Sequence, residues 1–306
     1  MSAQVKLNSA EPEAAMTVRE KKRRKTKKIV YLLILPAMVF LCCFTFYPFI
    51  KAIYLSFFVT DTVGNPGTFV GLKNYIRIFT SDGFLASLAA TFKFAGIVGV
   101  GTFFLSMFFA YFSLENRKGG KVYQTMFALP IALSSVPISA IAIYILGRNG
   151  LLNELLGTDV AWLSTESTAL FACAAVTIWA SVGSSYIFLL VGFRNVDESL
   201  LESAIIDGAG YFKRFIKVYV PIASPQIYFV VFLNIIHSFK SFAIVKLLVG
   251  AGPNDSTNVL IYAIYSNAFL RGRFETACVY AMVLCLVIFL FSRLQKFFEK
   301  RAVHYQ

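Results

Sequence analysis

The chain has 306 residues, of which 58% are hydrophobic, 16% aromatic and only 15% charged. Soluble domains carry about 25% charged residues, so this composition excludes an ordinary soluble protein and indicates a protein of the membrane. The net charge of +13 is concentrated in residues 19–28, directly before the first apolar run. Such a cluster favours contact with anionic lipid rather than binding of nucleic acid.

The first segment in chain order is this basic tail, residues 1–28, which we expect to be cytoplasmic. The apolar run behind it is too long for a cleaved signal peptide and lacks a small-residue cleavage site. The tail therefore predicts a topogenic anchor in front of a first transmembrane helix.

Six apolar windows follow, and each is long enough to cross a hydrocarbon core, which takes roughly 20 residues of helix. The windows are Ile29–Ile50, Phe84–Leu114, Thr125–Leu146, Leu170–Phe193, Gln226–Val249 and Thr276–Leu294. The expected fold is an all-α integral membrane protein with six transmembrane helices. Its membrane domain would cover residues 29–297, and residues 298–306 would form a cytoplasmic C-terminal tail.

The positions of Lys and Arg between the windows predict the orientation, because cytoplasmic segments carry the excess of basic residues. With the N-terminus inside, 20 of the 29 basic residues fall in cytoplasmic segments. The outer segments then hold Lys51, Lys73, Arg77, Arg148, Arg271 and Arg273, and three further lysines, Lys93, Lys240 and Lys246, lie within the windows. We therefore expect both termini to be cytoplasmic.

Two outer segments, residues 61–66 and 252–255, contain the Gly, Asn and Pro residues typical of ordered turns. These turns could contact an external partner, or they could be plain connectors. Composition alone favours neither interpretation.

The stretch between the fourth and fifth windows, residues 194–225, is long for a connector and carries most of the functional information. Apolar residues recur there at helical spacing beside carboxylates, which predicts a short helix with one apolar face. The apolar positions are Leu200, Leu201, Ala204 and Ile205, and the carboxylates are Glu198, Glu202 and Asp207.

Glycines are expected to end this helix, because Gly208 and Gly210 can adopt the left-handed conformation at little cost. A second amphipathic piece, from Phe212 to Val220, is expected to end at Pro221. A helix that leaves the membrane, turns and returns would form a rigid knob with backbone exposed at Gly208. The alternative is an interfacial helix that lies on the lipid surface.

Three short motifs in this stretch resemble the EAA loop of ABC importer permeases. They are Glu202-Ser203-Ala204, Asp207-Gly208-Ala209 and Val218-Tyr219-Val220-Pro221. The family pattern is Glu-Ala-Ala, two residues, Asp-Gly-Ala and then a hydrophobic-x-Leu-Pro ending. The chain keeps the spacing and departs only at Ser203 and Val220, both conservative in size.

Weaker matches extend the resemblance over most of residues 29–305. They are Tyr47-Pro48, the stretch Phe69–Tyr75 and the stretch Gly250–Pro253. Together they resemble the six-span carbohydrate-uptake permeases of the maltose and glycerol-phosphate type, which have the type I ABC importer fold.

The resemblance implies a coupling helix that inserts into a cleft of a separate ATPase subunit. The contact residues would be Glu202, Ser203, Ala204, Asp207, Gly208, Ala209 and Pro221. It also implies a second homologous permease subunit, two ATPase subunits and an extracytoplasmic solute-binding protein, in a bacterial or archaeal plasma membrane.

The chain's own motifs agree with an external source of energy. Gly119-Gly120-Lys121 is followed by Val122 and lacks the earlier glycine of a Walker A loop, so nothing is expected to cradle phosphate. We therefore expect a transporter subunit that is not itself an enzyme and has no cofactor, with ATP and Mg bound by the partner ATPase.

Polar side chains within spans are costly and tend to face a cavity or pathway. The candidate substrate-path residues are Asn234, His237, Ser238, Lys240 and Ser241 in the fifth window, and Ser181 and Ser185 in the fourth. Hydroxyl and amide groups beside aromatic rings suit a sugar. The serines could instead serve helix packing, and Lys240 could snorkel to the interface or meet the phosphate of a glycerol phosphate.

Two other classes of membrane protein fit less well. A secondary transporter or channel would couple ion flow through carboxylates or histidines, and the windows contain no Asp or Glu. A membrane enzyme would need a nucleophile, a base or a metal cluster, and the five cysteines lack the spacing of a zinc site. The resemblance thus implies a permease that imports a carbohydrate by alternating access, with a glycerol phosphate or another non-sugar solute as the open alternative.

Overall fold

The computed structural model describes residues 30–114 and 120–302. The chain divides into two units, one ending at Tyr54 and the other beginning at Leu55. In the first unit the chain is helical from residue 30, passes through a π-helical turn at Cys42–Phe46 and continues into α2 (Tyr47–Ser56). The basic tail predicted at residues 1–28 lies outside the described residues.

Six helical segments of the described chain are long and apolar enough to cross a membrane, which confirms the predicted number. They are Val30–Leu55, Asp82–Phe112, Ser135–Leu156, Glu166–Arg194, Ser224–Leu248 and Phe274–Glu299. Five of them coincide with the predicted windows apart from a few residues at the ends. The third begins at Ser135 rather than at Thr125.

The third span was misplaced because a proline interrupts the apolar window. Helix α5 (Gly120–Ala128) ends in a 3₁₀ turn, Leu129–Ala132, that contains Pro130, and the chain is then extended at Leu133 and Ser134. Proline cannot donate the backbone hydrogen bond that a continuing helix requires. The span therefore starts afresh as α6 (Ser135–Leu146), followed by α7 (Leu151–Leu156).

The fifth span was predicted as one helix and is two. Helix α12 (Ser224–Phe239) ends at Lys240, and α13 (Ala243–Leu248) begins three residues later. A tight turn joins them, in which the Phe242 N–H donates to the Lys240 carbonyl oxygen at 2.8 Å. Neither proline nor glycine stands at the break, so the sequence carried no signal for it.

The predicted turn at residues 61–66 joins a β-hairpin, β1 (Phe58–Thr60) and β2 (Pro66–Phe69), whose strands are antiparallel. The Asp61 carboxylate holds the turn by accepting hydrogen bonds from the backbone N–H groups of Val63 and Asn65 at 3.0 and 2.7 Å. These bonds, with a side-chain bond from Asn65 as the largest contribution, hold the pKa of Asp61 below its usual value. The hairpin was not predicted, because its strands are short.

Two shorter helices were also not predicted. Helix α3 (Lys73–Phe79) follows the hairpin, and α14 (Leu260–Tyr265) continues into a π-helical turn at Ser266–Leu270. Neither is long enough to span a membrane, and both lie in segments that were expected to be loops.

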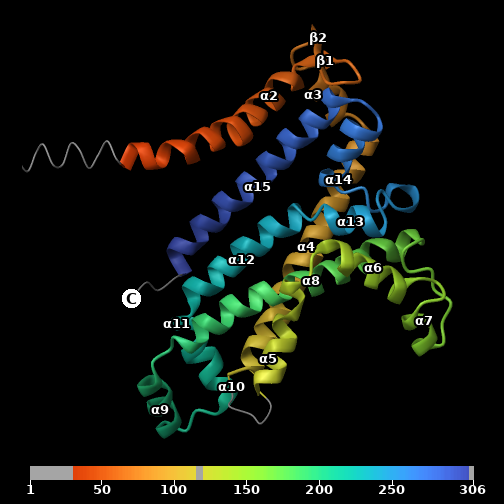
Figure 1. Cartoon of the computed structure of the whole chain (residues 1–306). Coiled ribbons are helices and arrows are strands. Elements are labelled where there is room, and N and C mark those ends of the chain that lie inside the picture. The colour runs from red at the N-terminus through yellow and green to blue at the C-terminus, as the bar shows by residue number, and fades with distance from the viewer. Residues whose placement is uncertain (1–29, 115–119, 303–306) are drawn as a thin grey trace, which may run out of the picture. The chain divides into compact units, whose positions relative to one another are not determined.

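The core of the second unit is the packing of α4 (Asp82–Phe112) against α8 (Glu166–Arg194), with α12 beside both and α15 (Phe274–Ala302) along α12. Large side chains such as Phe84, Tyr186 and Phe193 are almost completely buried. In Figure 1 the hairpin lies at the upper end of this unit and α9 (Glu198–Ile206) at the lower end. We call these the hairpin end and the α9 end.

Candidate functional site

The predicted knob forms at the α9 end. Helix α9 stops at Asp207, and Gly208 then takes the left-handed conformation, with φ +72°. The helix end is closed by backbone bonds, from the Ala209 N–H to the Ala204 carbonyl oxygen at 2.9 Å and from the Gly208 N–H to the Ile205 carbonyl oxygen at 3.0 Å. This glycine-terminated ending is the one that the motif predicted.

The surface of the knob is open. Glu202, Ser203 and Asp207 are exposed, and a Cβ atom built on Gly208 would meet no atom of this chain within 4 Å. Apolar side chains are exposed as well, and Ile206 has a relative exposure of 86%. A knob that shows both carboxylates and bare apolar groups is suited to contact with another protein.

The base of the knob, in contrast, is anchored firmly to α4. The Tyr211 hydroxyl donates to the Tyr111 carbonyl oxygen at 2.8 Å, and the two rings lie 4.7 Å apart. Phe215 is buried, with its ring 4.6 Å from that of Tyr111 and 5.3 Å from that of Phe193 on α8. Sequence reasoning missed these anchors, although the aromatic residues that follow Gly210 were a usable signal.

The second amphipathic piece continues into the next span rather than ending at Pro221. It consists of α10 (Tyr211–Arg214), a π-helical turn at Phe215–Tyr219 and α11 (Val220–Ile222), and α12 begins at Ser224. Pro221 stands just after the π-helical turn, within a helical run that continues from Tyr211 to Ile222, and it has no backbone N–H to donate there. It is exposed, as are Glu202, Ser203, Asp207 and Gly208 of the motifs.

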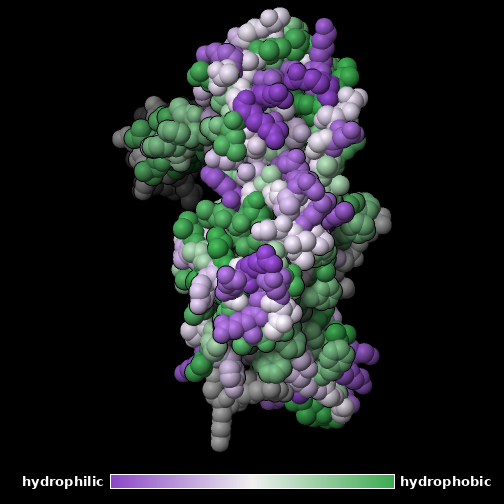
Figure 2. All heavy atoms as spheres, turned by 90° about the vertical axis from the view of Figure 1, so that its right-hand side faces the viewer, coloured by the Kyte–Doolittle hydropathy of each residue, from purple (hydrophilic) through white to green (hydrophobic). Residues whose placement is uncertain are grey.

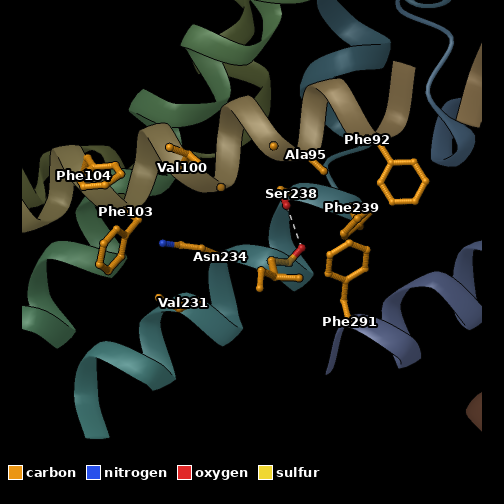
Figure 3. Close-up of a pocket in the computed structure, with 13 residues that line it drawn as sticks. Phe92, Ala95, Val100, Phe103, Phe104, Val231, Asn234, Ser238, Phe239 and Phe291 are labelled. Carbon is orange, nitrogen blue, oxygen red and sulfur yellow. Dashed lines mark hydrogen bonds between the residues drawn. The ribbon is translucent and has the colours of Figure 1, made fainter. Parts of the chain in front are cut away.

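A second candidate site is a cavity of about 300 Å³ between α4, α12 and α15. Phenylalanines form much of its wall, and Asn234 and Ser238 supply its polar groups (Figure 3). The aromatic members are Phe92, Phe103, Phe104, Phe239 and Phe291. Apolar ring faces beside a few polar atoms could hold a sugar ring.

Asn234 is the polar residue best placed to bind something in this cavity. Its Oδ1 accepts a hydrogen bond from Ser185 Oγ on α8 at 2.8 Å, and its buried Nδ2 has no hydrogen-bond partner among the described residues. In Figure 3 this nitrogen points along the cavity toward Phe103. An unsatisfied buried donor carries a free-energy cost of about 1–3 kcal/mol, which a ligand acceptor would remove.

The other predicted path residues do not line this cavity together. Ser238 does line it, but its hydroxyl already donates to the Ile235 carbonyl oxygen at 2.8 Å. His237 and Lys240 are exposed on another side of α12, and Ser241 lies in the break after it. Ser181 is half-buried, and Ser185 is buried against α12, where it links two helices.

Residues 102–304 match the family described as binding-protein-dependent transport system inner membrane component. The chain is 29% identical over 282 residues to the sn-glycerol-3-phosphate transport system permease protein UgpA of Yersinia pestis, covering 90% of this chain and 95% of the relative. It is 28% identical over 288 residues to UgpA of Shigella flexneri, covering 92% and 97%.

Among solved structures, a chain of a bacterial ABC transporter involved in the import of the acidic polysaccharide alginate matches with a TM-score of 0.82 at 20% identity. The match covers 94% of this chain and 100% of that chain. A chain of an amino acid ABC transporter matches with a TM-score of 0.54 at 18% identity, covering 78% and 100%. Both likenesses concern the fold, which is that of an ABC importer permease. Since the family match spans more than half of the sequence and includes the α9 knob, the chain belongs to the family of binding-protein-dependent transport system inner membrane components and is the permease subunit of an ABC importer.

Proposed function

We propose that this chain forms half of the translocation pathway of an importer that takes a carbohydrate from an extracytoplasmic binding protein. The other half would be a second homologous permease, and two separate ATPase subunits would bind ATP and Mg and grip the α9 knob. The single observation that carries the proposal is the knob itself, exposed at Gly208 and anchored to α4 through Tyr211. The membrane would be a bacterial or archaeal plasma membrane, with the α9 end in the cytoplasm.

The anchoring supports a mechanical role for the knob. A segment that moved independently of the spans could not pass a displacement on, whereas Tyr211 and Phe215 fix the knob to α4 and α8. Closure of the ATPase subunits would then move these helices as rigid bodies between inward-facing and outward-facing arrangements. Docking of a loaded binding protein would bias the same equilibrium.

The proposed partners are consistent with what a structural neighbour is known to assemble with. The alginate transporter has been solved in complex with an alginate pentasaccharide-bound periplasmic protein. The present chain covers 96% of the matching chain of that complex. A permease of this fold can thus receive an oligosaccharide from a periplasmic protein.

An anionic solute, such as a glycerol phosphate, is the second candidate, and the charges inside the spans favour it. Among Asp, Glu, Lys, Arg and His, the residues more than one turn from the ends of α4 and of the α12–α13 segment are Lys93, His237 and Lys240, and none of them is a carboxylic acid. Membrane-embedded charges of a single sign need an anionic counterpart. The UgpA relatives are named for sn-glycerol-3-phosphate, and the alginate transporter for an acidic polysaccharide.

The test is uptake by a strain that lacks this chain and is complemented with wild type, Gly208→Asp or Gly210→Asp. The solute panel pairs neutral and anionic compounds: maltose with an oligouronide, and glycerol with sn-glycerol 3-phosphate. Gly208→Asp should insert normally but abolish uptake, because a side chain would obstruct close approach at the knob. Gly210→Asp is the matched control, since Gly210 has an ordinary φ of −61° and occupies the N-cap of α10, where Asp is favoured.

The outcomes separate the claims. Uptake that survives Gly208→Asp would remove the coupling role of the knob. Loss of maltose uptake identifies an importer of a neutral carbohydrate, and loss of oligouronide or sn-glycerol 3-phosphate uptake alone selects an anionic solute. Normal uptake of every solute in the deletion strain would contradict both.

A further inference from the structure

A second cavity, of about 440 Å³, lies at the hairpin end, and three arginines line it. Arg77 comes from α3, and Arg271 and Arg273 come from the loop that leads into α15. The remaining lining includes the buried residues Glu275 and Asn267. We call this the arginine cavity.

The loop that carries two of the arginines is held in place by its backbone. The N–H of Arg271 donates to the Ser266 carbonyl oxygen at 3.0 Å, and the N–H of Arg273 donates to the Asn267 carbonyl oxygen at 2.8 Å. Gly272 between them has φ +64°, and a Cβ atom there would lie 3.3 Å from the Thr62 side chain. The two arginines therefore project from a preorganised loop packed against the hairpin turn.

The positive charge of the cavity is only partly compensated. Glu275 is the single carboxylate in the lining, and its Oε2 already accepts a hydrogen bond from Thr60 Oγ1 at 2.6 Å. Its Oε1 lies 3.7 Å from Arg77 Nη2, which is too long for a strong hydrogen bond. Among the described residues, the side chains of Arg271 and Arg273 form neither a hydrogen bond nor a salt bridge, so their donors are available.

The location of the cluster is unexpected on electrostatic grounds. The hairpin end is opposite α9 (Figure 1), and the segments there were predicted to be extracytoplasmic, where the basic residues of membrane proteins are few. The sequence places only six Lys and Arg in these outer segments, and three of them converge on this one cavity. On the face drawn in Figure 2, hydrophilic residues are present at the same upper end.

We propose that the arginine cavity is a docking point for the extracytoplasmic solute-binding protein and receives one of that protein's Asp or Glu side chains. This inference rests on the proposed function, since it requires such a partner. Arginine suits the role because its planar guanidinium binds a carboxylate through two parallel hydrogen bonds. Charges at the rim of an interface also attract the partner and fix its register.

The occupant is a protein side chain rather than the transported solute because of where the cavity lies. Its lining comes from α3, the start of α4, the loop before α15 and the start of α15, and none of the predicted path residues of α8 and α12 reaches it. A group bound here stays at the outer end of the bundle while the solute passes elsewhere. A lipid phosphate is the competing anion, and the experiment includes it.

The test uses the complete transporter, with both permeases and the ATPase, reconstituted in nanodiscs. The probe is the purified solute-binding protein whose loss abolishes uptake in the same strain. The double variant Arg271→Gln/Arg273→Gln is compared with Lys51→Gln/Lys73→Gln, which removes the same charge from the outer segments but leaves the cavity intact. The readout is ATPase activity against the concentration of binding protein, in phosphatidylcholine alone and with phosphatidylglycerol added.

The cavity variant should raise the half-maximal concentration of binding protein about tenfold, the effect of losing one close charge pair, and leave basal and maximal ATPase rates unchanged. The control pair should shift it by less than about twofold, and added salt should weaken the wild type more than the cavity variant. An unshifted cavity variant would overturn the inference while leaving the proposed function intact. A shift in the half-maximal concentration that is seen only with phosphatidylglycerol would assign the cavity to lipid and would also overturn the inference. A wild-type complex whose ATPase activity the binding protein does not stimulate would remove the proposed function itself.

Discussion

Asn234 offers the sharpest test of the membrane cavity, because its two polar atoms have different surroundings. Oδ1 is bonded to Ser185, and Nδ2 faces the cavity without a partner among the described residues. Replacing Asn234 by Leu removes both atoms at nearly constant volume. The further change Ser185→Ala removes the hydroxyl that would otherwise lose its acceptor.

The expected effect on stability is small. Hydrogen bonds between membrane helices are worth about 0.6 kcal/mol on average and up to about 1.7 kcal/mol. Asn234→Leu loses that bond and leaves the Ser185 hydroxyl without its acceptor, but it also removes the unsatisfied Nδ2, so the single variant should cost at most about 1 kcal/mol. The double variant should regain much of that loss, since it leaves no buried hydroxyl without its partner. Thermal unfolding in detergent, read as the shift in the midpoint, measures both values.

The expected effect on transport is larger. If Nδ2 donates to the solute, its loss removes one hydrogen bond of about 0.5–1.5 kcal/mol, which corresponds to a roughly two- to tenfold lower uptake rate at low solute concentration. Both the single and the double variant should show it. Ser238→Ala is the matched control, because the Ser238 hydroxyl lines the same cavity but is bonded to the Ile235 carbonyl oxygen.

Two results would refute the reasoning. A stable double variant with undiminished uptake would make Asn234 a packing residue that the solute does not touch. An equal loss of uptake in Ser238→Ala would show that transport depends on the shape of the cavity and not on the amide donor.

Two further predictions concern residues 148–162, which cover the end of the third span and the loop that follows it. Asn153 is buried; its Nδ2 donates to the Arg148 and Val160 carbonyl oxygens, each at 2.8 Å, and its Oδ1 accepts from the Trp162 indole N–H at 2.8 Å. Asn153→Leu should therefore destabilise the protein by about 2–4 kcal/mol. The change should be seen as a lower unfolding midpoint and faster proteolysis of the loop. The second prediction concerns Asp159, which Arg148 contacts through two hydrogen bonds at 2.7 and 2.8 Å. This contact holds the pKa of the Asp159 carboxyl below its ordinary value. The stability contributed by the contact is therefore fully present at pH values above the ordinary pKa and is lost as the pH falls through the lowered pKa. Arg148→Gln should therefore lower the unfolding midpoint slightly at pH 7, and the difference should vanish once the carboxylate is protonated; a difference that is independent of pH would contradict this origin.

The parts of the fold that the sequence predicted are those with a local physical signal. The six spans follow from hydrophobic length, and the end of α9 follows from Gly208, which has the left-handed backbone that glycine favours. The third span was displaced because window hydropathy does not register the break at Pro130. The sequence could have shown this, since proline is a recognised helix breaker.

Other features depend on tertiary contacts and leave no mark in a single sequence. The break after α12 contains neither proline nor glycine, so the predicted polar stripe was assumed to continue through Ser241. The pairing of Asn234 with Ser185 joins residues 49 positions apart, and the arginine cavity joins α3 to the loop before α15. The sequence shows that these residues are polar or charged and that they lie within or near spans. Which of them come into contact is decided only by the packing of the helices.

Helix α4 connects the two candidate sites, and this bears on how the knob could drive transport. Tyr111 near its end anchors the knob through Tyr211, and Phe103 on the same helix lines the membrane cavity. Eight residues separate them, which is about 12 Å along a continuous helix. The α-helical backbone is unbroken from Asp82 to Phe112 and packs along α8, so a displacement of the knob cannot be absorbed in a loop before it reaches the cavity. The wall formed by α12 is bonded to α8 through Asn234 and Ser185. A displacement of the knob that moved α4 relative to α12 would change the shape of the cavity, as alternating access requires.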